Sequence, residues 1–92
     1  MSRIKASHIL VKTEGEAIDL VGKIKNGESF EKLAKANSNC PSGRNGGDLG
    51  YFGKGQMVRE FENAAFALSV GEVSKPVKTQ FGWHIIKLTD KK

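Results

Sequence analysis

Two histidines lie inside apolar runs near opposite ends of the chain. His8 precedes Ile9 and His84 precedes Ile85, and both runs have the β-branched and aromatic composition of buried strands. A buried imidazole without a hydrogen-bond partner is costly. We therefore expect the two strands to be neighbours in one sheet, so that each ring can bond to the other or to a nearby hydroxyl. The resulting polar cluster is either an unusually polar core or the floor of a site.

The single cysteine, Cys40, raises the question of covalent catalysis. A cysteine nucleophile needs a base, and its thiolate is usually stabilised by a helix N-terminus or a cation. Cys40 instead follows a predicted helix, whose dipole opposes a thiolate at that end. A metal site of His8, His84 and Cys40 would typically need a fourth ligand. We expect neither metal nor covalent chemistry, although a cysteine hydrolase remains an alternative.

Four apolar side chains flank a glycine-rich turn: Leu49, Phe52, Met57 and Phe61. The first two belong to a short predicted strand, and the last two to the start of a helix. Ordinary core is the simpler interpretation of this set. Met57, however, follows an exposed turn, where methionine often serves an adaptable binding surface. A pocket of leucine, methionine and phenylalanine has the right size for a small apolar ring.

Eight glycines fall between Gly43 and Gly82, so phosphate binding must be considered. A P-loop needs Gly-Lys followed by serine or threonine, whereas Lys54 is followed by Gly55. The glycines are therefore expected to make tight turns and close backbone contacts.

The composition of the chain describes one globular domain. It has 92 residues, of which 38% are hydrophobic and 27% charged, enough for one modest core. The net charge of +5 is scattered along the chain, so we do not expect a nucleic-acid partner, although a basic nucleic-acid-binding domain remains an alternative. No apolar stretch approaches the roughly 20 residues that span a bilayer. Together with the single cysteine, this favours a cytoplasmic protein without a membrane partner.

Periodicity predicts an α+β fold whose terminal strands lie in the middle of the sheet. Alternation places Ile4, Ala6, His8 and Leu10 on one face of the first strand. The expected elements are a strand over residues 3–12, helices over 13–26, from Ser29 to about 37 and over 58–68, and strands over 49–52, 73–77 and 83–89.

The chain resembles the parvulin-type peptidyl-prolyl cis/trans isomerases from about residue 4 to residue 88. The resemblance implies a four-stranded antiparallel sheet surrounded by four helices, in the order β-α3-β-α-β2, the fourth helix being a short turn near residues 41–44. The segments that carry it are Ser7-His8-Ile9-Leu10-Val11-Lys12, Gly47-Asp48-Leu49-Gly50-Tyr51-Phe52, Gly55-Gln56-Met57-Val58 with Phe61, and Phe81-Gly82-Trp83-His84-Ile85-Ile86.

The resemblance also implies roles for individual residues. His8 and His84 resemble the paired central histidines, and Cys40 falls where family members carry cysteine or aspartate. Thr79 matches the hydroxyl residue that helps to hold the histidines. The proline-ring pocket corresponds to Leu49, Met57 and Phe61, with Phe52 as its rear wall and Gln56 in the same loop.

One departure concerns phosphate recognition. Phosphate-directed relatives carry a long basic loop after the first strand, whereas this chain has the short, mostly acidic Lys12-Thr13-Glu14-Gly15-Glu16. A lone lysine does not make a phosphate clamp. We therefore expect a monomeric, stand-alone isomerase over residues 1–92, without cofactors, that acts on proline-containing peptides and on unfolded or flexible protein segments. A peptide-binding or chaperone module with little turnover remains an alternative.

Overall fold

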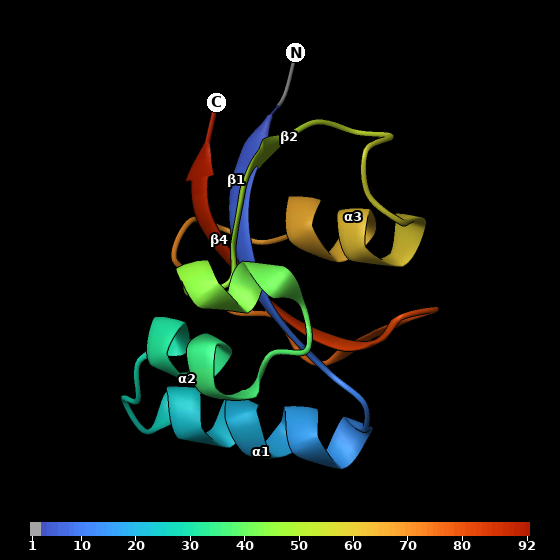
Figure 1. Cartoon of the computed structure of the whole chain (residues 1–92). Helices are drawn as coiled ribbons and strands as arrows, with labels where there is room; N and C mark the ends of the chain where they lie inside the picture. Colours follow the sequence, from blue (N-terminus) through green and yellow to red (C-terminus); the bar gives the residue numbers. More distant parts are fainter. Residues whose placement is uncertain (1–2) are drawn as a thin grey trace.

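A single four-stranded antiparallel sheet organises the computed structural model, which describes residues 3–92 (Figure 1). The spatial order is β2-β1-β4-β3, so the first and last strands lie side by side at the centre, as the sequence predicts. The expected α+β class is confirmed. The strands are β1 (Ile4–Val11), β2 (Asp48–Phe52), β3 (Val77–Thr79) and β4 (Gly82–Lys91).

Helices begin and end close to the residues that the sequence indicates. The side chains of Thr13 and Ser29 cap the first two helices by accepting backbone N–H bonds. Asn26 ends the first helix and Gly27 follows it with a φ of 96°. The short turn expected near residues 41–44 is a 3-10 helix. The helices are α1 (Glu14–Lys25), α2 (Phe30–Asn37), η1 (Pro41–Asn45) and α3 (Arg59–Phe66).

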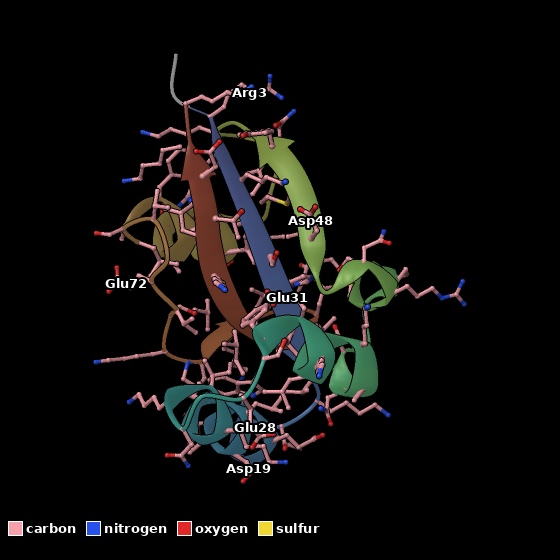
Figure 2. The ribbon with its side chains drawn as sticks, turned by 90° about the vertical axis from the view of Figure 1, so that its left-hand side faces the viewer. Arg3, Asp19, Glu28, Glu31, Asp48 and Glu72 are labelled. Atoms are coloured by element: carbon pink, nitrogen blue, oxygen red, sulfur yellow. The ribbon has the colours of Figure 1, made fainter. Side chains whose placement is uncertain are left out.

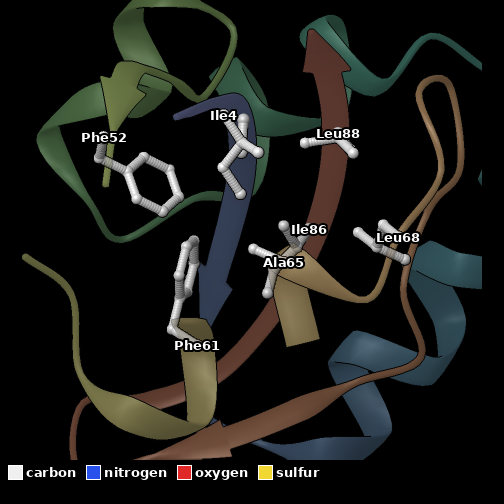
Figure 3. Packing of buried hydrophobic residues seen from close by; sticks show 8 residues of the cluster. Ile4, Phe52, Phe61, Ala65, Leu68, Ile86 and Leu88 are labelled. Carbon is white, nitrogen blue, oxygen red and sulfur yellow. The ribbon is translucent and has the colours of Figure 1, made fainter. Parts of the chain in front are cut away.

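Both faces of the central strands are covered, because their side chains alternate between two apolar clusters. Ile4 and Ala6 of β1 pack with Phe61 and Ala65 of α3 on one face (Figure 3). The alternate residues, including Ile9, pack against α1 and α2 on the other face. His8 belongs to the α3 face by the same alternation. The sheet therefore presents both histidines toward α3 rather than toward α1.

The third strand differs from its predicted position. Val73 makes only an isolated bridge to Lys87, and regular pairing begins at Val77. Pro76 explains the delay, because a proline has no N–H to donate to a sheet. Ser74 compensates within the gap, since its hydroxyl oxygen accepts the N–H of Ile86 at 2.9 Å.

Charged side chains lie around the outside of the molecule. Asp19 and Glu28, on α1 and on the link that follows it, point away from the sheet (Figure 2). The two ends of the described chain meet, because Lys92 N–H donates to the carbonyl of Arg3 at 2.8 Å. Within residues 3–92 no helix combines the length and the apolar character that crossing a bilayer requires.

Candidate active site

The two histidines meet because of the register between the central strands. His8 pairs with Ile86 and His84 pairs with Leu10, so the histidines are diagonal neighbours on one face. Their Nδ1 atoms lie 2.9 Å apart in a buried hydrogen bond, and their rings stack with centroids 5.1 Å apart. The contact between the histidines, expected from the two apolar runs, is therefore present.

Thr79 extends this contact into a chain of hydrogen bonds. Its Oγ1 lies 2.7 Å from His84 Nε2, on the side of the ring opposite His8. The same oxygen accepts the backbone N–H of Phe81 at 3.1 Å. The hydroxyl therefore connects the β3–β4 turn to the histidines. At the other end of the chain of bonds, His8 Nε2 is buried and has no partner among the described residues.

Phe61 shields the two histidines from water. The edge-to-face contacts of its ring place its centroid 5.5 Å from that of His8 and 5.3 Å from that of His84. Burial, followed by repulsion from His84, lowers the pKa of His8 to about 4. Burial also lowers the pKa of His84. Both imidazoles are therefore neutral at pH 7, since charging either one would require solvation that the site does not supply.

Gly47 supports the pair from the side of β2. Its carbonyl accepts the N–H of His8 at 2.9 Å. A Cβ at position 47 would lie 2.3 Å from the His8 carbonyl oxygen, and the φ of 88° is unfavourable for any other residue. Only glycine lets this loop approach the backbone of His8 so closely.

A cavity of about 520 Å³ opens beside the histidines. Leu49, Met57 and Phe61, the residues expected to hold a proline ring, line it together with both histidines and Cys40. Its lining contains no Asp, Glu, Lys or Arg side chain. The other lining residues are Leu10, Asn39, Pro41, Gln56, Val58 and Phe81.

Three further expected residues have distinct positions. Phe52 does not line the cavity but lies behind it, its ring centroid 6.1 Å from that of Phe61. Thr79 does not line the cavity either, and it contacts His84 through Nε2. Gln56 lines the cavity, while its Oε1 accepts the N–H of Gly53 at 2.6 Å and so holds its own turn.

The position of Cys40 corrects the helix-dipole argument. Cys40 does not end α2; it is the residue directly before η1, with an extended backbone at φ −91° and ψ 141°. Pro41 imposes this conformation, because the residue before a proline is excluded from the helical region. The C-terminal dipole of α2 therefore gives no reason for or against a thiolate. Within residues 3–92 no three His, Cys, Asp or Glu side chains lie together as a metal site would need.

Phe81, Leu10 and Val58 line the cavity although the sequence did not point to them. Phe81 enters the sequence analysis only as the first residue of a segment that carries the family resemblance. The sequence did contain a signal for Leu10, because alternation places it on the same strand face as His8.

The comparisons with known proteins agree with this geometry. The family model described as a PPIC-type PPIase domain matches residues 1–92. The "Foldase protein PrsA" of Geobacillus kaustophilus is 61% identical over 90 residues, which cover 97% of this chain and 32% of the relative. The chain thus spans about a third of the length of such curated relatives.

Solved structures extend the comparison. A PrsA peptidylprolyl isomerase from Bacillus anthracis superposes with a TM-score of 0.98 at 53% identity, covering 99% of this chain and 42% of that one. NmPin, the parvulin of Nitrosopumilus maritimus, superposes with a TM-score of 0.88 at 53% identity and covers 98% of both chains.

Proposed function

The chain belongs to the PPIC-type peptidyl-prolyl cis/trans isomerase family, and from this premise we propose that its cavity turns X-Pro bonds in flexible protein segments without covalent chemistry. Residues 1–92 act as one isomerase domain in this proposal. The observation that carries it is the uncharged cavity of about 520 Å³ beside a buried pair of neutral histidines.

The apolar wall of the cavity holds the proline ring. Leu49, Met57 and Phe61 come from β2, the following turn and α3, and they face one cavity. Phe52 supports Phe61 from behind. With the ring held, the preceding carbonyl is the part that turns.

An apolar cavity lowers the barrier because of how charge changes during rotation. The planar imide carries negative charge on oxygen and positive charge on nitrogen through resonance, and the twisted transition state loses that separation. The uncatalysed barrier is about 18–20 kcal/mol, and a useful enzyme removes roughly 5–8 kcal/mol of it. A site that solvates the planar form poorly binds the twisted form better in relative terms.

Neutral histidines suit this chemistry. A cation beside the carbonyl would stabilise the charge-separated planar form and raise the barrier. The lowered pKa values of His8 and His84 keep the cavity free of such a cation. The polarity of the floor is therefore set by hydrogen bonds rather than by charge.

The hydrogen bonds of the floor favour one arrangement of protons. Thr79 Oγ1 accepts from Phe81, so its own proton is free to go to His84 Nε2. His84 then donates from Nδ1 to His8, which places the proton of His8 on Nε2. The reverse arrangement leaves the Thr79 proton without an acceptor among the described residues, while His8 Nε2 has no partner there in either arrangement. Histidine side-chain ¹⁵N shifts measure these tautomers directly.

Cys40 tunes the local polarity in this proposal and is not a nucleophile. Its backbone N–H donates to Ser38 Oγ at 3.3 Å, and the half-buried residue lines the cavity. Rotation about an amide forms no new bond to the carbonyl carbon, so the reaction needs no nucleophile.

The substrate needs no phosphate. Only Lys12 and Thr13 separate β1 from α1, and Glu14 and Glu16 occupy the first turn of α1. This link therefore offers one basic side chain, Lys12, to a phosphate before the proline, and a lone lysine does not make a phosphate clamp. Equal kcat/KM for matched Glu-Pro and phosphoserine-Pro peptides is the expected result, and a large preference for phosphate contradicts it.

We also propose that the domain acts as a monomer in the reducing cytoplasm, without a nucleic-acid partner. The large exposed apolar side chains Ile18, Val70 and Phe81 come from α1, the α3–β3 link and the β3–β4 turn. Several lysines lie over aromatic rings of different elements, for example Lys92 at 4.3 Å from the Tyr51 centroid. The positive charge is therefore spread over several elements, whereas a nucleic-acid-binding domain gathers it on one face. Sedimentation equilibrium and cell fractionation test the first two points, and salt-dependent binding to nucleic acid tests the third.

The decisive experiment is exchange NMR on a short X-Pro peptide. Added protein should speed cis/trans exchange, with shifts in the resonances of the cavity residues. Met57→Ala should raise KM, whereas Val70→Ala, which removes an equally apolar but distant side chain, should leave it unchanged. Peptide binding without faster exchange would identify a binding module, and an acyl adduct by mass spectrometry would identify a hydrolase.

A further inference from the structure

Phe81 is a bulky aromatic side chain that the fold leaves uncovered at the cavity. It is 62% exposed, the highest value among the large exposed hydrophobic residues, and it lines the cavity that holds the histidines. Ile18 and Val70 have comparable exposure, 57% and 56%, but neither touches this cavity. The exposed ring is therefore specific to the rim of the site.

Hydrogen bonding and close packing fix the backbone that carries the ring. Phe81 lies in the turn between β3 and β4. The hairpin of these two strands is drawn in orange-red below α3 in Figure 1. Its N–H donates to Thr79 Oγ1, the same oxygen that bonds to His84. The next residue, Gly82, has a φ of 136°, and a Cβ there would lie 2.6 Å from the Val11 carbonyl oxygen. The turn thus holds the backbone of Phe81 at one place relative to the histidines.

An exposed ring at a binding cavity has apolar surface left to bury. Leu10, Pro41 and Val58 add further apolar surface to the same cavity. If the proline ring occupies the pocket of Leu49, Met57 and Phe61, the Cα of the adjacent substrate residue lies about 3.8 Å from the proline Cα. The side chain of that residue is the part of a peptide that can reach the rim.

We infer that Phe81 is a specificity-determining residue that binds an apolar or aromatic side chain directly next to the proline. This inference rests on the proposed isomerase function and adds a substrate preference to it. The driving force is burial of the exposed ring face against the substrate side chain.

The test compares Phe81→Ser with Val70→Ser, a matched removal of exposed apolar surface away from the cavity. Two peptide series vary the residue before and the residue after the proline through Phe, Leu, Ala and Glu. In one of the two series, Phe81→Ser should raise the KM of the Phe and Leu peptides about five- to tenfold, the value expected for roughly 1–1.4 kcal/mol of lost burial. The KM of the Ala and Glu peptides should change less than about twofold, and Val70→Ser should leave the KM of every peptide unchanged.

Several controls separate binding from structure. Serine keeps the N–H that bonds to Thr79, so unchanged histidine ¹⁵N shifts should accompany the loss of preference. Phe81→Leu should restore part of it. Equal changes for all peptides, or none in both series, would overturn the inference. A switch from oligomer to monomer in Phe81→Ser would overturn it too, by assigning the ring to self-association.

Failure of the proposed function gives a different result. A wild-type protein that does not speed exchange of any peptide would refute the isomerase. NMR titration would then still measure whether binding of the Phe and Leu peptides depends on Phe81.

Discussion

Lowering the pH from 7.5 to 5 should destabilise the protein through its histidine pair. Burial lowers the pKa of His8 from 6.5 to about 4. Between these two values the unfolded chain holds a proton that the folded chain excludes. Acid therefore favours unfolding in this window, and the contribution of His8 to stability is complete only above pH 6.5. The pKa of His84 is also lowered by burial, so its effect has the same sign.

The size of the effect follows from linkage. For one histidine with these two pKa values, the free energy of unfolding falls by about 2 kcal/mol between about pH 7.5 and pH 5. This is a large share of the roughly 5–15 kcal/mol that stabilises a typical domain. Asp90 does not confuse the measurement, because its hydrogen bond with Tyr51 lowers its pKa below 3.8 and moves its titration under the window.

Urea titrations followed by the fluorescence of Trp83, the single tryptophan, measure the free energy of unfolding at each pH. The urea midpoint should fall steadily from pH 7.5 to 5 with an unchanged m-value. His8→Gln, which does not titrate, should be less stable at neutral pH but show a shallower pH slope. A wild-type free energy of unfolding that stays flat over this range would refute the neutral, buried pair.

Three substitutions test other parts of the site. Cys40→Asp should retain substantial isomerase activity in the exchange assay, whereas near-complete loss would support a covalent role. Phe61→Ala should lower the free energy of unfolding by about 3–5 kcal/mol and raise the pKa of His8 in NMR titrations, because the ring excludes water; an unchanged pKa would contradict this. Gly47→Ala should cost several kcal/mol in urea titrations because its Cβ would overlap the His8 carbonyl, whereas Gly55→Ala, with a φ of 89° and no atom within 4 Å, should cost only about 1 kcal/mol. Equal losses for the two glycine variants would refute the role of the close approach.

Local patterns in the sequence were sufficient to predict the pairing of the central strands. Alternation along β1 and the apolar run around His84 placed both histidines on inner strands, and their shared need for a partner predicted the contact. The cavity wall was accessible in part, because Met57 and Phe61 lie close together in sequence. These signals succeed because strand and helix periodicity are local properties.

Features that depend on packing between distant segments were less accessible. Thr79 entered through the family resemblance alone, because its reach to His84 depends on the register of a hairpin. Periodicity places Cys40 after the end of a helix and gives no sign of the short helix that begins at Pro41, which only the family resemblance implies. The sequence did not identify Phe81 as a site residue, because a Phe-Gly pair does not indicate what the β3–β4 turn faces.

The central position of the first and last strands has a consequence for synthesis of the protein on the ribosome. The hydrogen bond between the histidines joins residues 76 positions apart in the chain. A nascent chain that has exposed β1 but not β4 therefore carries half of the site, and loop closure across these 76 positions must precede activity. Isomerase activity consequently reports that β4 has emerged from the exit tunnel and docked.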